Sequence, residues 1–407
     1  MIKLLLGGSP CTHWSIAQKN NRETEPSGLG WELFKNYLIA KEKYQPDYFL
    51  YENNKSASQA IKDQISKELG QPLQYINSAL VSAQNRQRFY CHNIPNVPQP
   101  TDRGILLRDV LESGEDLSQN DKSYCLTARY QGAVPWNTLE RSQRTMVIEP
   151  IKVGALPRPN GELSNSQAMR IYSVDGKSVT QSACGGGLGG KTGLYAVPLR
   201  VNEGTKQGYV DIAPGECVDL GMESSKTRRG RKMSDKSNCL TTQNQFYEYC
   251  GTVDNPLYRV ENGFITIKGK QYPIKLKNGY YIIRKLSVLE CKRLQTVPDD
   301  YIFPVSKTQA YKQLGNGWTV DVIAHILSYI PNIQNEEVEV LSMYDGMSCG
   351  HIALDKLGVN VIRYYAMEID KYAIQTTVAN YPNTIQLGDA FQVREDDWSV
   401  ENAVLRL

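Results

Sequence analysis

Long apolar runs, a secretory leader and paired cysteines are all absent from this sequence. No window of 18 or more apolar residues occurs, which argues against a membrane-spanning helix. The amino terminus lacks the charged, apolar and small-residue pattern of a signal peptide. The nine cysteines are odd in number and form no C-x-x-C pair, and the four histidines are dispersed. We therefore expect a cytoplasmic protein with reduced thiols, and without disulfides, a metal site or a membrane partner.

The bulk composition excludes little else. A hydrophobic content of 41% is ample for a globular core, and 407 residues suggest about two to three domains. The formal net charge of +3 is only a weak hint of an anionic partner. Function must therefore be sought in local motifs.

The first residues of the chain form the pattern around which we organise the sequence. A short apolar run, 2–6, is bounded by Gly7 and Gly8. This is typical of a buried parallel strand that ends at the carboxyl edge of a sheet, where ligands and chemistry collect. Pro10 fixes the backbone just before Cys11, so that a thiol is presented from the turn. Cys11 is a candidate nucleophile, and the alternative is a small, packed apolar residue.

The hexapeptide around Cys11 resembles a motif of the DNA cytosine-5 methyltransferases, whose thiolate attacks carbon 6 of a cytosine. The family motif is Pro-Cys-x-x-aromatic-Ser, and this chain reads Pro10-Cys11-Thr12-His13-Trp14-Ser15. Further segments resemble later motifs of the family: Glu52-Asn53-Asn54, Gln84-Asn85-Arg86-Gln87-Arg88, the run from Arg284 to Pro298, and Gln313-Leu314-Gly315-Asn316. Asn54 departs from the usual third residue of its motif.

The motifs that normally open these enzymes stand after position 335. An apolar run, 338–343, precedes Tyr344-Asp345-Gly346-Met347-Ser348-Cys349-Gly350, which resembles the family's cofactor loop. A second run, 361–367, ends at Glu368, and a third, 384–387, precedes Asp389. The chain therefore resembles a circular permutant that begins at the nucleophile strand, which is tolerable because domain termini tend to lie close together at the surface.

Hydrophobic patterning divides the chain. Short apolar strands alternate with helical stretches before position 95, whereas the middle of the chain is rich in Gly, Ser and Thr; helical periodicity returns from Gly279. We expect an α/β fold with a doubly wound, mostly parallel sheet, Rossmann-like and circularly permuted, and an inserted smaller β-rich domain. The expected boundaries are 1–100, 279–334 and 335–407 for the three parts of the catalytic domain, and 104–278 for the target recognition domain.

The resemblance implies a role for each motif residue. Cys11 would add to the base, Glu52 would act at nitrogen 3, and Arg88, supported by Arg86, would bind the oxygen at carbon 2. S-adenosylmethionine would be the cofactor and S-adenosylhomocysteine its product. The implied cofactor residues are Tyr344, Asp345, Gly346, Met347, Ser348, Cys349, Gly350, Glu368, Ile369, Asp389, Ala390, Pro10, Asn316 and Gly317. Ser348 and Cys349 replace glycines that are common in the family.

Double-stranded DNA would be the partner, with the target cytosine flipped out of the helix. The implied DNA-binding residues are Ser15, Gln84, Lys226, Arg228, Arg229, Arg231 and Lys232. The five basic residues could instead belong to a solvated loop, although beside a cytosine-modifying site contact with the DNA backbone is favoured. We expect a monomer, with a cognate restriction enzyme as a further partner.

Four other readings are weaker. Gly185 to Thr192 matches the phosphate-loop pattern, yet a polar segment precedes it and no helix of useful length follows. A dehydrogenase would be expected to show G-x-G-x-x-G, which the loop at 344–350 lacks. An amino methyltransferase would carry Asp or Asn, two prolines and an aromatic residue in place of Ser9-Pro10-Cys11. A DNA-binding relative without catalysis need not keep Cys11, Glu52 and Arg88 together.

Overall fold

The protein is described here from a computed structural model. The described residues are 1–15, 22–150, 152–155, 170–173, 194–196, 199–202, 204–206, 208–212, 217–219, 232–233, 246–248, 257–267, 269–276 and 279–406. No helix within these ranges is long and apolar enough to cross a membrane.

A seven-stranded sheet forms the centre of the fold. Its order is β21 (Ile385–Gln386), β20 (Asn360–Met367), β19 (Glu337–Met343), β1 (Ile2–Gly7), β2 (Tyr48–Asn54), β4 (Gln87–His92) and β3 (Leu73–Asn77). The five strands from β21 to β2 pair in parallel, and β4 runs antiparallel to both of its neighbours. The predicted α/β class is confirmed, and the sheet is mixed.

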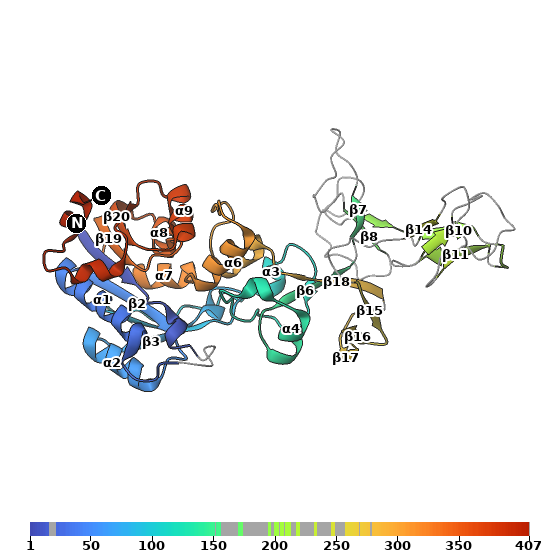
Figure 1. The fold of residues 1–407 in the computed structure, drawn as a ribbon, viewed down its shortest axis with the longest axis horizontal. Helices are drawn as coiled ribbons and strands as arrows, with labels where there is room; N and C mark the ends of the chain where they lie inside the picture. Colours follow the sequence, from blue (N-terminus) through green and yellow to red (C-terminus); the bar gives the residue numbers. More distant parts are fainter. Residues whose placement is uncertain are drawn as a thin grey trace.

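The first and last parts of the chain meet inside this sheet. Strand β1 pairs with β19 from Ile2↔Val338 to Gly7↔Met343, and on its other side with β2. The amino-terminal ammonium group lies 2.9 Å from Glu336, and both termini lie at the same end of the molecule (Figure 1). The carboxyl ends of β1, β2, β19 and β20 therefore share one edge of the sheet.

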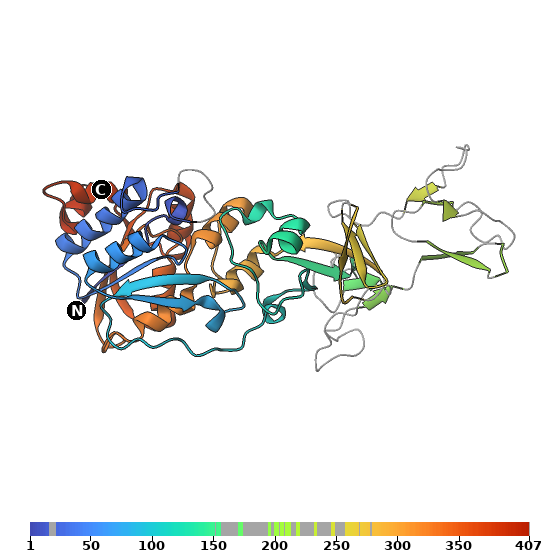
Figure 2. The same cartoon turned by 90° about the horizontal axis from the view of Figure 1, so that it is seen from below.

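Helices cover both faces of the sheet (Figure 2). The side chains of β1 alternate between these two faces, so each face has apolar residues to pack against its helices. Leu4 and Leu6 pack with apolar residues of α7 (Val320–Leu327) and α8 (Cys349–Lys356). Leu5 packs in a separate cluster with residues of α1 (Gly28–Tyr44), α2 (Gln59–Leu69) and α10 (Val400–Leu405). All three leucines are fully buried.

Local sequence explains where the helices begin and end. Helix α2 begins after Ser58, whose Oγ accepts a hydrogen bond from the Ile61 amide, and ends at Gly70, where φ is 68°. Helix α9 (Lys371–Asn380) is capped by Asp370 in the same way. The remaining helices of this part are α5 (Val288–Leu294), α6 (Lys307–Asn316) and the 3-10 helices η1 (Cys11–His13), η2 (Ser78–Leu80) and η6 (Ala390–Arg394).

A second, antiparallel sheet lies beside the first (Figure 1). Its order is β17 (Lys270–Pro273), β16 (Phe264–Ile267), β15 (Leu257–Glu261), β18 (Gly279–Lys285), β6 (Met146–Pro150) and β5 (Glu115–Asp116). The expectation that helical structure resumes at Gly279 is wrong, because residues 279–285 form β18. In this strand Tyr281 and Ile283 are buried at alternate positions, as in a half-buried strand.

Short elements complete the described middle of the chain. Helices α3 (Leu107–Val110) and α4 (Pro135–Arg141) lie between the two sheets (Figure 1). The 3-10 helix η3 (Tyr130–Gly132) precedes α4 in the chain. Smaller sheets combine β7 (Lys152–Ala155), β8 (Arg170–Ser173) and β9 (Leu194–Ala196); β10 (Leu199–Asn202) and β11 (Tyr209–Ile212); and β12 (Cys217–Asp219), β13 (Lys232–Met233) and β14 (Phe246–Glu248). The phosphate-loop pattern at 185–192 lies outside the described residues.

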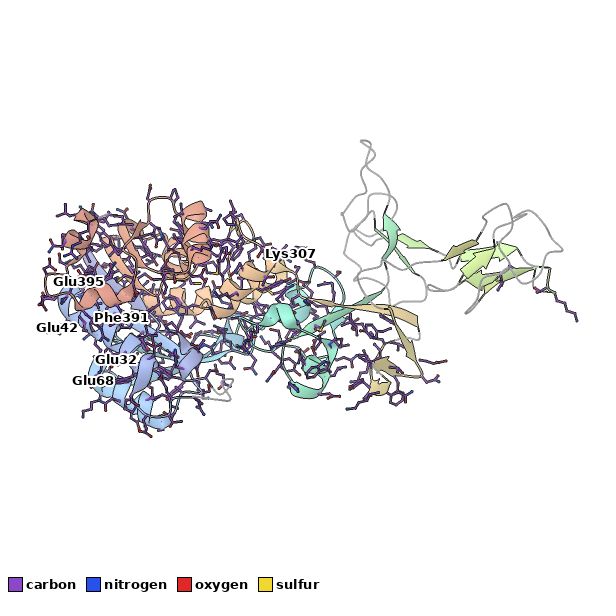
Figure 3. The ribbon with its side chains drawn as sticks, in the orientation of Figure 1. Glu32, Glu42, Glu68, Lys307, Phe391 and Glu395 are labelled. Carbon is purple, nitrogen blue, oxygen red and sulfur yellow. The ribbon has the colours of Figure 1, made fainter. Side chains whose placement is uncertain are left out.

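Figure 3 shows side chains filling the space between the seven-stranded sheet and its helices. Phe391 and Glu395 lie at the end of this domain that is far from the second sheet, whereas Lys307, at the start of α6, lies toward it. One apolar cluster joins Leu4 of β1 to Tyr281 and Ile283 of β18, so the core continues from the first sheet into the second.

Candidate active site

One cavity of about 490 Å³ opens at the carboxyl edge of the seven-stranded sheet. It has two groups of lining residues, which we name after the roles that the sequence predicts. The base end comprises Glu52, Arg86 and Arg88, for which the sequence predicts roles at the base, together with Thr12, Trp318 and Pro10; Pro10 is among the residues predicted to contact the cofactor. The cofactor end comprises Tyr344, Asp345, Gly346, Met347, Glu368, Ile369, Asp389 and Ala390. Residues that stand far apart in the chain are thus brought to one cavity.

The backbone of Cys11 lies at the base end. Strand β1 leads through Ser9 to η1, which begins at Cys11, and the flanking Pro10 and Thr12 both line the cavity. Two hydrogen bonds from β2 fix the position of Ser9. Its Oγ is hydrogen-bonded to Tyr51 Oη at 2.7 Å, and its carbonyl accepts a hydrogen bond from the Asn53 side chain at 3.0 Å. The side chain of Cys11 lies outside what the structure describes.

Glu52 presents its carboxylate at the end of β2. Pairing of β2 with β4 sets Asn54 opposite Arg88 and so brings that arginine beside Glu52. Arg88 Nε lies 2.9 Å from Glu52 Oε1, and Trp318 Nε1 donates to Glu52 Oε2 at 3.0 Å. The side chains of Glu52 and Arg88 are only 11% and 14% exposed. Sequence reasoning identified Glu52 and Arg88 but missed Trp318.

Arg86 has a different environment from Arg88. Its guanidinium donates to the carbonyls of Leu126 at 3.1 Å, Gly315 at 3.3 Å and Gly317 at 2.8 Å, and it is 3% exposed. These bonds tie the loop after α6 to the segment around Leu126. Arg86 therefore supports the cavity wall, and Arg88 is the arginine that reaches the predicted catalytic carboxylate.

Cys125 is a thiol beside the two arginines of the base end, and sequence reasoning also missed it. Its Sγ accepts a hydrogen bond from Arg86 Nη1 at 3.4 Å, and Arg88 Nη2 lies 4.0 Å away. Burial raises the pKa of Cys125, but the two guanidinium groups outweigh burial and leave this pKa below its ordinary value. At the cofactor end, by contrast, burial raises the pKa of Cys349 to about 12.

Backbone amides fix the carboxylate of Glu368 at the cofactor end. Gly346 N donates to Glu368 Oε2, and the amides of Ile369 and Asp370 donate to Oε1, each at 2.8 Å. Ile369 is 72% exposed, which is unusual for an isoleucine and leaves an apolar surface beside the cavity. Asp389 caps η6 by accepting from the Phe391 amide at 2.9 Å.

The loop from Tyr344 to Ser348 bends without the usual glycine at its end. Ser348 has a left-handed backbone with φ of 55°, a conformation that favours glycine. Its hydroxyl donates to Asp345 and is hydrogen-bonded to Thr377 at 3.0 Å. Burial raises the pKa of Asp345 to about 6, against the opposing hydrogen bonds from Ser348 and Tyr364. Ser348 ends the loop and Gly350 lies in the first turn of α8; neither lines the cavity.

The last turn of α6 and the glycine after it add polar groups to the cavity wall. Asn316 and Gly317, both predicted to contact the cofactor, line the cavity together with Gln313. Gln313 is 6% exposed, and neither end of its side-chain amide has a hydrogen-bond partner within the described part of the chain. A buried amide without partners is costly, so this one is suited to a polar ligand.

Of the predicted DNA-binding residues, only Ser15 and Gln84 have described side chains, and neither lines the cavity. Gln84 is fully buried; its amide donates to Leu294 O at 3.1 Å and accepts from Leu126 N at 2.8 Å, so it has no exposed atoms to offer DNA. Ser15 is partly buried at the end of the η1 loop. Lys226, Arg228, Arg229 and Arg231 lie outside the described residues, and only the backbone of Lys232 is described, in β13.

Comparisons with known proteins point to one family. A model of the family "C-5 cytosine-specific DNA methylase" matches residues 1–97 and 191–332, more than half of the chain. The orphan methyltransferase M.SPRI of Bacillus phage SPR is 24% identical over 389 residues, with 79% of this chain and 81% of the relative covered. M.Rho11sI of Bacillus phage rho11s, also an orphan methyltransferase, is 25% identical over 452 residues, with 83% and 86% covered. A solved methyltransferase of Entamoeba histolytica has 13% identity and a TM-score of 0.34, with 80% of this chain and 76% of its own covered.

Proposed function

Because the chain belongs to the C-5 cytosine-specific DNA methylase family, we propose that it transfers a methyl group from S-adenosylmethionine to carbon 5 of a cytosine in duplex DNA. The observation that carries this proposal is the single cavity in which the Glu52–Arg88 pair faces the same space as Glu368, Ile369 and Asp389. A base and a cofactor must meet in one space for direct transfer between them.

The cofactor end fits S-adenosylmethionine. The Glu368 carboxylate is prearranged by three amides and keeps lone pairs for the hydroxyls of a ribose. Ile369 offers an apolar face to an adenine, and Asp389 offers an acceptor to its amino group. The amide of Gln313, which has no partner among the described residues, is free to bind a polar group. Gly346 leaves open space, since a Cβ there would have no atom within 4 Å. These residues would also hold the product, S-adenosylhomocysteine.

The residues at the base end have distinct tasks in this proposal. When bound, S-adenosylmethionine supplies an electrophilic methyl group. The Cys11 thiolate adds to carbon 6 of the cytosine, because carbon 5 is a poor nucleophile until a bond to carbon 6 forms. Glu52 shares a proton at nitrogen 3 and so stabilises the electron density that this addition places on the ring. Arg88 binds the oxygen at carbon 2. Once carbon 5 carries the methyl group, its proton leaves to solvent and the electrons of that C–H bond expel the Cys11 sulfur from carbon 6, which restores the aromatic ring and frees Cys11.

DNA binding completes the proposal. A cytosine in a stacked duplex is inaccessible to Cys11 and Glu52, so the base must be flipped out at a cost of a few kcal/mol. We assign the contacts that offset this cost to the target recognition domain, 104–278, with its basic residues from Lys226 to Lys232 on the phosphates. Strand β18, which follows this range and ends at Lys285, pairs with β6 and β15 from within it. The protein would act as a monomer, alone or beside a cognate restriction enzyme.

We further infer that the chain is a circular permutant of its family. The family match lies within 1–332 and stops before the loop at Tyr344. Parallel pairing of β19 with β1 sets the strand that leads to Tyr344 directly beside the strand that leads to Cys11. The parts 1–100, 279–334 and 335–407 would then form one catalytic domain, since the first and third share a sheet.

The proposal is tested by expressing the chain in a host that lacks cytosine methylation and measuring modified bases by mass spectrometry and bisulfite sequencing. The expected result is 5-methylcytosine in a defined sequence context, absent from cells that express Cys11→Ser. Methylation of the exocyclic nitrogen of cytosine or adenine would contradict the proposal, and so would unmodified DNA in the presence of folded protein.

A further inference from the structure

We propose that Trp318 is a positioning residue for this reaction: its indole N–H holds one oxygen of the Glu52 carboxylate while Arg88 holds the other. The inference rests on the proposed function and deepens it. Trp318 follows the segment that resembles the tenth family motif, and none of the roles that the resemblance implies falls on it.

The geometry divides the carboxylate between two donors. Trp318 Nε1 lies 3.0 Å from Glu52 Oε2, and Arg88 Nε lies 2.9 Å from Oε1. One donor comes from the loop between α6 and α7, the other from β4. Two donors on different oxygens fix the rotation of the carboxylate plane, which a single donor leaves free. The plane decides whether an oxygen of Glu52 can face nitrogen 3 of a base.

The backbone on either side of Trp318 is itself anchored. The carbonyl of Gly317 accepts from Arg86 Nη2 at 2.8 Å and from Gln295 Nε2 at 3.2 Å. Thr319 Oγ1 donates to Gln295 Oε1 at 2.9 Å. The indole therefore belongs to a rigid segment, as a residue that orients a catalytic group requires.

The indole packs close to two glycines, where a larger residue would press on it or on Glu52. A Cβ on Gly8 would lie 2.8 Å from Glu52 O, 3.2 Å from Glu52 Oε2 and 3.3 Å from Trp318 Nε1. A Cβ on Gly350, in α8, would lie 3.8 Å from Trp318 Cζ3. Trp318 thus fills the space between the loop that carries Cys11 and the first turn of α8.

Trp318→Phe tests the role of the N–H, because phenylalanine keeps an aromatic ring and loses the donor. A hydrogen bond to a charged group corresponds to roughly a ten- to hundred-fold effect on an equilibrium or rate. We expect the single-turnover rate of methyl transfer at saturating DNA and S-adenosylmethionine to fall by about that factor, and cofactor affinity to stay unchanged. A variant carrying benzothienylalanine at position 318 keeps the size of the indole and removes only the N–H, so it should reproduce the loss with the fold preserved.

Trp398→Phe is the matched control. Trp398 is 4% exposed, and its Nε1 has no partner among the residues that the structure describes. This substitution also removes an indole N–H from the same domain, but one that is bonded to nothing described. We expect the transfer rate of Trp398→Phe to match that of the unmodified protein.

A double-mutant cycle separates positioning from packing. If Trp318 acts through Glu52, then Trp318→Phe should cause no further loss in a Glu52→Gln background. The readout is the exchange of the carbon 5 hydrogen of cytosine with solvent, which reports addition at carbon 6 without methyl transfer. A full-sized loss in the Glu52→Gln background would overturn the inference, as would an unchanged rate for the benzothienylalanine variant. Failure of the unmodified protein to form 5-methylcytosine would instead overturn the proposed function.

Discussion

The cofactor end and the base end of the cavity differ in how far apart in the chain their residues stand. The cofactor end is built largely from the run 344–390, and backbone amides of that run hold its key carboxylate, Glu368. The base end combines side chains that stand far apart in the chain, such as Trp318 and Glu52, which are 266 positions apart and share a hydrogen bond. Backbone amides of neighbouring residues fix the carboxylate of the cofactor end before a ligand binds. The geometry of the base end depends instead on single pairs of side chains from distant segments. Substitutions at the two ends should therefore change different constants.

Cys11→Ser should have the largest effect. A serine hydroxyl is far less nucleophilic than a thiolate, so methyl transfer should fall below detection. Binding of DNA and of S-adenosylmethionine should persist, because neither depends on the thiol. Gel-shift and calorimetric titrations beside a transfer assay would check this result, and measurable turnover by the serine variant would remove Cys11 from its role.

Glu52→Gln should lower the rate of methyl transfer and leave the affinity for the cofactor unchanged. Loss of a general acid or base costs about a hundred-fold or more in rate. Cofactor affinity should remain as it is, because Glu368 lies in another segment with its own hydrogen bonds. Single-turnover kinetics and cofactor titration measure the two quantities separately. A large loss of cofactor affinity would show that the two ends are not independent.

Glu368→Gln should give the opposite pattern. In the variant, the NH₂ group of the glutamine side chain faces backbone N–H donors that bind a carboxylate oxygen in the unmodified protein. The glutamine also loses the charge-assisted hydrogen bonds that Glu368 would make to a ribose. We expect about 1.5–3 kcal/mol of lost cofactor binding, or roughly a ten- to hundred-fold rise in Kd. The rate at saturating cofactor should recover. A rate that stays low at saturation would place Glu368 in the chemistry.

Asp345→Asn should change how stability depends on pH. Burial raises the pKa of Asp345 from 3.8 to about 6, so the folded protein binds this proton more tightly than the unfolded chain does. The contribution to stability is complete below about pH 4 and is lost as the pH rises through about 6, a change on the order of 3 kcal/mol. Urea titrations between pH 4 and pH 7 should show a flatter profile for Asp345→Asn. An identical dependence of the free energy of unfolding on pH in the two proteins would contradict the raised pKa of Asp345.

Thiol reactivity should show a smaller contrast between the ends. Arg86 and Arg88 hold the pKa of Cys125 below its ordinary value despite its burial, whereas burial raises the pKa of Cys349 to about 12. The thiolate is the reactive form, so iodoacetamide should label Cys125 before Cys349. Peptide mass spectrometry over time measures both. Labelling of Cys349 first would show that access to the reagent, and not the neighbouring arginines, sets the order.

The sequence predicted that Glu368 and Asp389 would meet at one sheet edge, and both line the cavity, while their contact with a cofactor stays a prediction. Glu368 and Asp389 follow apolar runs that end at one sheet edge, and residues just after parallel strands must converge there. The same reasoning placed Glu52 near Cys11. It could not find Trp318, Cys125 or the unpaired amide of Gln313, because their roles arise from contacts between segments whose spacing in the chain carries no signal.

Two expectations show why motif letters are insufficient. Gln84 belongs to a recognisable motif, yet its side chain turns inward to Leu294 and Leu126, and a motif does not state which way a side chain faces. Residues 279–285 are rich in tyrosine and isoleucine, which favour strands, and they form β18. The helical pattern begins only after them, so the expected start of helical structure at Gly279 was too early.

The most direct test of the account is to trap the covalent intermediate. Duplex DNA with 5-fluorocytosine at the target should form a stable complex in the presence of S-adenosylmethionine, because fluorine cannot leave as a proton does. Mass spectrometry of the digested complex should find the modified nucleotide on Cys11. An adduct on Cys125 or any other cysteine, or methyl transfer to normal DNA without any adduct on the fluorinated substrate, would contradict the account.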